Sequence, residues 1–175
     1  MSTIYFDNAA TTKVRKEVAQ SMSKVINDEY GNPSSTHSYG RSSKAIIELS
    51  RKEIADLLNV KSSEIIFTSG GTEGDNMIIR NCVHNLGTRH IISSKIEHHA
   101  VTHTIDDLVS SHNIKVSYVN IFNNGDIDIE DLEKILKETK ERSLVSLMHI
   151  NNEIGNITDL NSVGDICNCL LYTSD

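Results

Sequence analysis

The stretch EIIFTSGGTEGDN, residues 64–76, decides the fold. Its first part, Ile65 to Thr68, is rich in β-branched and aromatic residues and predicts a short buried strand. The next apolar residues have helical spacing and predict a helix whose buried face contains Met77, Ile78, Cys82 and Leu86. We therefore expect a strand, a turn of small residues and a helix at the centre of the fold.

The turn between this strand and helix has the chemistry of a phosphate-binding site. Gly70 and Gly71 allow a sharp turn and a close approach of a ligand, and Thr72 can donate from its N–H and its hydroxyl. The first turn of the helix adds unpaired N–H groups and the positive end of the helix dipole. The alternative is a plain turn in which Thr72 caps the helix and Glu73 favours the dipole. The spacing fits neither a P-loop nor a dinucleotide-binding loop.

The composition predicts a cytoplasmic protein without a membrane span. The 175 residues suffice for one domain with a core, and there is neither an apolar run of membrane length nor an N-terminal signal pattern. The net charge of −7 disfavours nucleic acid and anionic membranes as partners. Three cysteines without disulfide spacing fit a reducing compartment.

The rest of the chain alternates helices with strands. We expect an N-terminal arm over residues 1–13, a helix capped by Thr11 or Thr12, a loop from Gly31 to Arg41 that is either functional or a plain surface loop, and a helix over 42–58. Further strands are expected at 89–93, 115–121 and 144–148, with a helix capped by Asp128 between the last two. This alternation predicts an α/β fold with right-handed crossovers.

Three polar residues follow three different predicted strands. Thr72, His98 and Asn152 each come where a strand ends, which is the edge where parallel α/β sheets bind ligands. For each a structural interpretation stays open, because His98 can serve as a polar helix cap and Asn152 can close a turn. His99 and His103 could offer a zinc pair, but no third ligand has metal spacing, so no metal is predicted.

Taken together, these motifs resemble the N-terminal half of a cysteine desulfurase of the class V aminotransferase group, on the branch that supplies sulfur for iron–sulfur clusters. The resemblance runs from Ile4 to about Cys167. Five stretches carry it in order: YFDNAATT at 5–12, GNPSS at 31–35, FTSGGTE at 67–73, EHHAV at 97–101 and MHINNEIG at 148–155. Lys13 stands where the family often has proline, a departure that costs little at a helix start.

The resemblance implies a pyridoxal 5′-phosphate (PLP) enzyme. Its fold would be the three-layer α/β sandwich of PLP-dependent transferase fold type I, here an incomplete large domain over residues 14–168. Gly71 and Thr72 would hold the phosphate, His98 would stack on the ring and help to move protons, and Asn152 would hydrogen-bond the 3′ oxygen. L-Cysteine would become L-alanine, and the sulfur would pass as an enzyme persulfide to an acceptor or iron–sulfur scaffold protein. The whole enzyme would be a homodimer.

Several parts of that enzyme have no counterpart here. The Schiff-base lysine and the persulfide-forming cysteine are expected downstream, and none of Cys82, Cys167 and Cys169 lies in a matching motif. Asp175 lacks the expected setting for the aspartate that pairs with the pyridine nitrogen. We interpret residues 169–175 as a non-family tail, an artefact at the end of a truncated reading frame. Such a fragment is expected to be inactive alone and marginally stable, because the predicted strand at 65–68 lacks its neighbour.

The sequence leaves other functions open. Within enzymes, these are a selenocysteine lyase or another class V aminotransferase. Outside enzymes, the alternative is a non-catalytic short paralogue that binds a desulfurase or a scaffold partner. Release of alanine from cysteine or from selenocysteine separates the enzymatic alternatives.

Overall fold

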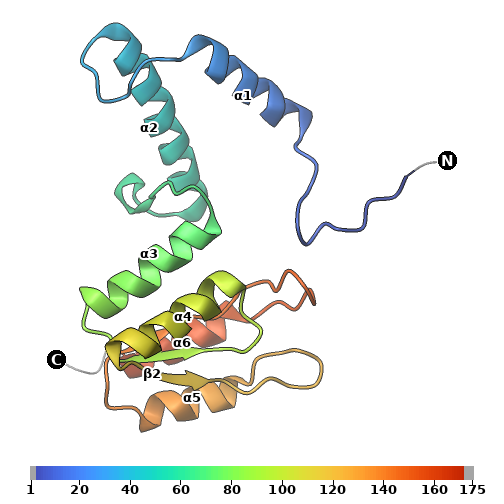
Figure 1. Ribbon diagram of the computed structural model, residues 1–175, viewed down its shortest axis with the longest axis vertical. Helices are drawn as coiled ribbons and strands as arrows, with labels where there is room; N and C mark the ends of the chain where they lie inside the picture. Colours follow the sequence, from blue (N-terminus) through green and yellow to red (C-terminus); the bar gives the residue numbers. More distant parts are fainter. Residues whose placement is uncertain (1–2, 172–175) are drawn as a thin grey trace. The chain divides into compact units, whose positions relative to one another are not determined.

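The computed structural model describes residues 3–171 and divides the chain into two compact units, Met1–Phe67 and Thr68–Asp175 (Figure 1). The first unit contains α1 (Lys16–Asp28), α2 (Ser38–Leu58) and the short 3-10 helix η1 (Ser62–Glu64). The second contains β1 (His90–Ser93), β2 (Lys115–Tyr118) and β3 (Ser143–Val145) with the helices α3 (Gly71–His84), α4 (His99–His112), α5 (Ile129–Glu138) and α6 (Leu160–Leu171). The predicted boundaries at residues 13 and 168 stay predictions, and residues 172–175 of the predicted tail lie outside the described residues.

Helix α1 begins later than the sequence predicted. Its N-cap is Arg15, which makes no side-chain capping bond, so the expectation that Thr11 or Thr12 caps this helix is wrong. The backbone N–H of Thr11 instead donates to the carbonyl of Asp7 in a turn before the helix. None of the residues of α1 is buried.

Helix α2 begins four residues before the predicted start because the loop in front of it provides a cap. The Nδ1 of His37 accepts a hydrogen bond from the Gly40 N–H at 3.3 Å. Gly40 is buried, and a Cβ there would lie 2.4 Å from the Ser35 carbonyl oxygen. The loop thus packs so closely on the first turn of α2 that Gly31 and Gly40 have no room for a side chain. At the other end, Asn59 terminates the helix in the left-handed conformation.

The stretch from Ile65 to Thr68 is not a strand, and this prediction is wrong. Ile66 and Phe67 are 66% and 47% exposed. A strand needs a neighbour for its N–H and C=O groups, and no strand within residues 3–171 pairs with this stretch. In place of a sheet partner, the Arg51 guanidinium donates to the Ile65 carbonyl and lies 4.8 Å from the centre of the Phe67 ring.

The second unit is a three-layer α/β sandwich. Its sheet has the order β2-β1-β3, and both pairs are parallel, with Ile91 opposite Val116 on one side and Leu144 on the other. Figure 1 shows α4 and α5 on opposite sides of this sheet. Strands β2 and β3 are shorter than the predicted runs 115–121 and 144–148. The predicted α/β class and parallel sheet are confirmed.

Two apolar clusters hold the layers together. Ile91 packs with α3 and α4, and the next residue, Ile92, packs with α5 and α6, as expected for successive side chains of a central strand. Helix α3 contributes Ile79 and Val83, each 2% exposed. The predicted face is therefore wrong, since Met77 and Ile78 are 41% and 56% exposed. The buried face is the one that packs on α4, because Ile79 and Val83 cluster with Val101, Ile105 and Leu108.

Candidate functional site

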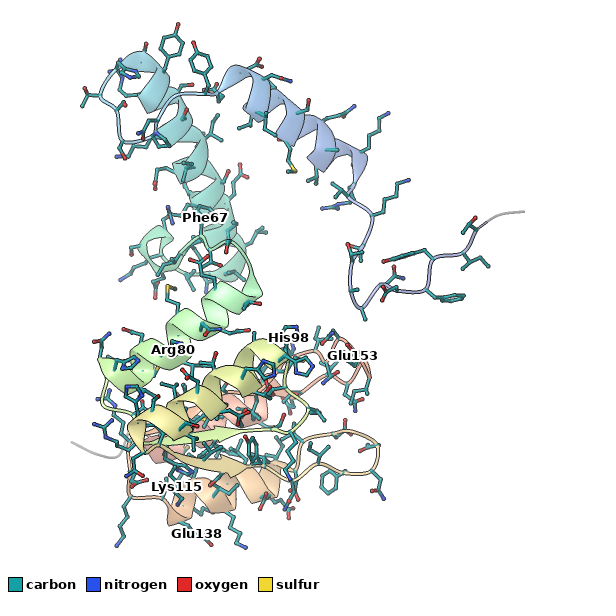
Figure 2. All side chains as sticks on the ribbon, in the orientation of Figure 1. Phe67, Arg80, His98, Lys115, Glu138 and Glu153 are labelled. Carbon is teal, nitrogen blue, oxygen red and sulfur yellow. The ribbon has the colours of Figure 1, made fainter. Side chains whose placement is uncertain are left out.

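The three predicted ligand-binding residues all lie in the second unit. His98 and Asn152 follow β1 and β3 as predicted, whereas the prediction that Thr72 follows a strand is wrong, because residues 65–68 form none. Thr72 is in the first turn of α3, His98 immediately precedes α4, and Asn152 is in the loop after β3. His98 and the loop around Glu153 are labelled in Figure 2. The described helices of this chain include none long and apolar enough to cross a bilayer.

The turn before α3 presents free hydrogen-bond donors. Gly70 is the N-cap and offers no side chain, so the N–H groups of Gly71 and Thr72 have no acceptor within the helix. The Thr72 hydroxyl is exposed and makes no hydrogen bond with the described residues, so the alternative in which Thr72 caps α3 is wrong. A Cβ at Gly71 would meet no described protein atom within 4 Å. The space that a glycine leaves here is open to a ligand such as a phosphate.

Glu73 closes one side of this turn. Its carboxylate accepts a hydrogen bond from the Ser69 N–H at 2.6 Å. The side chain of Ser69, and after it this backbone bond, lower the pKa of Glu73. An ionised carboxylate at this position also favours the N-terminal end of the helix dipole. Glu73 therefore favours the helix dipole, as the plain-turn alternative expected. Its carboxylate binds the Ser69 N–H, so the N–H groups of Gly71 and Thr72 can still bind other acceptors.

His98 caps α4 through Nδ1, which leaves its other ring nitrogen, Nε2, for other partners. Its Nδ1 accepts from the Ala100 N–H at 3.1 Å. The neutral ring then carries its proton on Nε2, which can donate to a ligand. His98 is exposed and lines the hollow beside α3. The capping role that the sequence left open is present. It orients the imidazole ring through Nδ1 and does not use Nε2.

Thr72 and His98 line one open hollow of about 330 Å³ between α3 and α4. Asn76, which the sequence analysis did not select, also lines this hollow. Its Nδ2 donates to the Thr72 carbonyl at 2.9 Å, and the buried Thr104 hydroxyl lies 2.7 Å from its Oδ1. Asn76 stands one helical turn after Thr72, a spacing that could have indicated a shared face.

Arg80 extends the same wall and supplies its positive charge. Its Nε lies 3.2 Å from Oδ1 of Asn76, and one terminal nitrogen donates to Asp107 on α4 at 2.7 Å. This pair is exposed, so its contribution to stability is small. Its place in the site is a link from the α3 wall, where Figure 2 labels Arg80, to Asp107 on α4.

Asn152 does not line this hollow. It is exposed, and among the described residues its Nδ2 donates only to the neighbouring Glu153 carboxylate, at 3.2 Å. The preceding residue, Asn151, is 6% exposed and donates to the Ile96 carbonyl at 2.8 Å. The loop that carries Asn152 is thus attached to the segment that leads to His98.

The other candidate groups are less suited to chemistry. The rings of His99 and His103 stack with centres 5.1 Å apart, and residues 3–171 contain no group of three or more metal-ligating side chains. Cys82, Cys167 and Cys169 are free thiols. Burial raises the pKa of the Cys82 thiol, an effect that the charge of Arg142 opposes, and burial also raises the pKa of Cys167. Neither of these two environments favours a nucleophilic thiolate.

Parallel α/β folds commonly bind anionic ligands where helix N-termini with free N–H groups meet the carboxyl edge of the sheet. The start of α3 beside His98, the N-cap of α4, has the donors that such a site needs. The sequence model of the family described as "Aminotransferase class-V" matches residues 4–170. The chain therefore belongs to the class V aminotransferase family.

Individual relatives agree with this assignment. A protein of Dictyoglomus turgidum named "Cysteine desulfurase IscS" is 43% identical over 168 residues, which are 93% of this chain and 41% of the relative. A solved structure described as "NIFS-LIKE PROTEIN" has a TM-score of 0.88 and 36% identity over 95% of this chain and 46% of its own. A second, described as "SspA in complex with cysteine", has a TM-score of 0.86 and 31% identity over 94% and 47%.

These comparisons confirm the fold that the resemblance implied. The second unit is part of the α/β large domain of fold type I, as in the NifS-like neighbours. The chain spans about two fifths of the length of the curated relatives that it matches.

Proposed function

We propose that this chain provides the phosphate-binding turn and ring contacts of a PLP-dependent cysteine desulfurase, which converts L-cysteine to L-alanine. The observation that carries the proposal is the single hollow lined by Thr72 at the start of α3 and by His98 at the start of α4. The cysteine-desulfurase names of the relatives and the cysteine complex of one structural neighbour support this choice of substrate.

The residues present fit PLP in charge and in donor chemistry. The N–H groups of Gly71 and Thr72, with the Thr72 hydroxyl, offer donors to a phosphate dianion at the positive end of α3. The exposed His98 ring offers a flat face to a pyridine ring, and its Nε2 can hold a proton near the substrate. The Asn152 amide can donate to the ring's 3′ oxygen. When bound, PLP supplies an electron sink for bond breaking next to the amino group.

The later steps of the proposal concern groups outside this site. The sulfur is passed as a persulfide on a cysteine to an acceptor or iron–sulfur scaffold protein, in a cytoplasmic homodimer. We assign this cysteine to none of the three in the chain, because burial raises the pKa of Cys82 and Cys167 and because Cys169 lies in no matching motif.

The test uses the full-length product of the gene. We expect it to bind PLP and to release alanine from L-cysteine. The variant Thr72→Val keeps the side-chain shape but loses the hydroxyl donor, so we expect PLP to bind about tenfold more weakly. Ser110→Ala, an exposed change on α4 away from the hollow, is the matched control and should leave the PLP dissociation constant unchanged.

Three results would count against the proposal. Exclusive release of alanine from selenocysteine would favour a selenocysteine lyase, and amino transfer without sulfur release would favour another class V aminotransferase. A gene product that binds no PLP but captures a desulfurase or scaffold protein would be a non-catalytic paralogue.

A further inference from the structure

The segments that carry His98 and Asn152 are joined by one carboxylate. Oε1 of Glu97 accepts a hydrogen bond from the Ser94 hydroxyl at 2.9 Å and another from the Met148 N–H at 2.8 Å. Ser94 follows β1 directly, and Met148 is the third residue after β3. The side chain of Glu97 therefore bridges two strand ends that are distant in the sequence and adjacent in the sheet.

A second contact joins the same two segments. Asn151 donates from Nδ2 to the Ile96 carbonyl, and its Oδ1 accepts from the N–H groups of Glu153 and Ile154 at 2.9 and 3.1 Å. Its own N–H donates to the Asn156 carbonyl. Asn151 thus folds the loop on itself and anchors it beside residue 96. Since Asn152 lies inside this loop, its position is determined by the two anchors.

Glu97 does not act as an ion-pair partner within the described residues. Among the described residues, no cationic side chain forms a salt bridge with it. Burial raises the pKa of Glu97, and the negative charge of Asp75 on α3 raises it further, while the two hydrogen bonds lower it. Placing a carboxylate here carries a desolvation cost that its two hydrogen bonds offset only in part.

We propose that Glu97 is a positioning residue of the PLP site, whose carboxylate sets the place of Asn152 relative to His98. This role rests on the proposed function, since it concerns the two residues that would contact the PLP ring. Glu97 itself reaches the adjoining loops through Ser94 and Met148. The phosphate contacts of Gly71 and Thr72 come from α3 and do not depend on this bridge.

The experiment compares Glu97→Ala with Glu97→Gln in the full-length product of the gene. Both hydrogen bonds end on one oxygen, which a glutamine carbonyl can replace, whereas alanine removes both. We expect E97A to weaken PLP binding about tenfold and to change the visible circular dichroism of the bound PLP, while E97Q stays within about twofold of the unsubstituted protein. Inorganic phosphate should bind equally to all three. The exposed Glu141→Ala is the matched control.

A double-mutant cycle tests whether Glu97 acts through Asn152. In an Asn152→Ala background, E97A should weaken PLP binding by less than about twofold, because the group that it positions is already absent. If E97A fails to fold, Ser94→Ala removes one of the two hydrogen bonds with less disturbance and should weaken binding about threefold. The same comparison of PLP with inorganic phosphate then applies.

The outcomes separate this role from the proposed function. An unsubstituted protein that binds no PLP would overturn the proposed function and this role of Glu97 with it. If the unsubstituted protein binds PLP, but E97A or S94A leaves both the affinity and the circular dichroism unchanged, only the positioning role is overturned. Equal effects of E97A with and without Asn152, or a parallel loss of inorganic phosphate binding, would also overturn it.

Discussion

Two neighbouring asparagines show how burial divides the roles of similar residues. Asn151 is 6% exposed and makes hydrogen bonds with five other residues, whereas Asn152 is exposed and its side chain makes a hydrogen bond only with Glu153 among residues 3–171. A buried amide is satisfied within the protein, so it stabilises the loop. An exposed amide on a loop anchored by its buried neighbour can still donate to a ligand, which is what a binding site needs.

Alanine substitutions should separate these two roles. We expect Asn151→Ala to lower the free energy of unfolding by about 1–3 kcal/mol, because it leaves the Ile96 carbonyl and two N–H groups without their partner. Asn152→Ala should change it by less than about 0.5 kcal/mol, as is usual for an exposed position. Urea denaturation of both variants provides the measurement. Equal losses of stability would show that the loop does not depend on Asn151.

Elements whose signals are local could be predicted from the sequence. Helix α5 is an example, since Asp128 accepts from the Asp131 N–H at 3.1 Å as its N-cap and Leu132 and Leu136 are buried as expected. The parallel strands β1 and β3 were likewise recognisable from their apolar runs. The location of Thr72 and His98 at helix starts followed from the same kind of pattern.

Elements whose signals depend on a partner could not be predicted. Residues 65–68 have the composition of a strand but no neighbour to pair with among the described residues. The face that α3 buries was chosen by its contact with α4, which sequence spacing does not show. In the site, Asn76 and Glu97 act through bonds to residues 28 and 51 positions away, to Thr104 and Met148. Contacts between residues so far apart produce no periodic pattern that a single sequence could show.

Strand β1 contains a buried histidine that makes the stability of the sheet depend on pH. His90 is 0% exposed, and its ring nitrogens lie 2.8 Å from the Ser117 hydroxyl, 3.1 Å from that of Thr139 and 3.2 Å from that of Ser143. Burial lowers the pKa of His90, and the charge of Lys115 lowers it further, against an opposing effect of Glu141. The folded protein therefore binds this proton less readily than the unfolded chain does.

Acid should therefore weaken the fold through His90. Its contribution is fully present above the unfolded pKa of about 6.5 and is lost as the pH falls below that value, by up to about 1.4 kcal/mol per pH unit. We expect His90→Gln to be less stable than the unsubstituted protein at pH 8 and to lose less stability between pH 7 and 5. Urea denaturation at several pH values measures this, with the exposed His112→Gln as control. Parallel pH profiles for H90Q and the unsubstituted protein would contradict the assignment.

At the scale of the whole molecule, the two units differ in how well they cover their apolar residues. The sheet of the second unit has helices on both faces, and its central residues Ile91 and Ile92 are fully buried. In the first unit, α1 buries none of its residues, and large apolar side chains of its region are exposed, namely Val14, Val18, Met22, Val25 and Ile26. These residues recur at helical spacing, so they form a stripe, and exposed apolar stripes of this kind mark surfaces for association.

This difference predicts that the 175-residue chain associates in solution through its first unit. We expect sedimentation to show a mass that rises with concentration, bound hydrophobic dye at neutral pH, and an unfolding transition that is neither sharp nor reversible. Met22→Glu, which places a charge in the middle of the α1 stripe, should reduce both dye binding and association, whereas Gln20→Glu adds the same charge to α1 outside the stripe and should reduce them less. The far-ultraviolet circular dichroism should stay the same in both variants, because neither side chain is buried in the fold. A monomeric chain with a sharp, reversible transition would contradict this prediction, and an equal effect of the two substitutions would place the association outside the stripe.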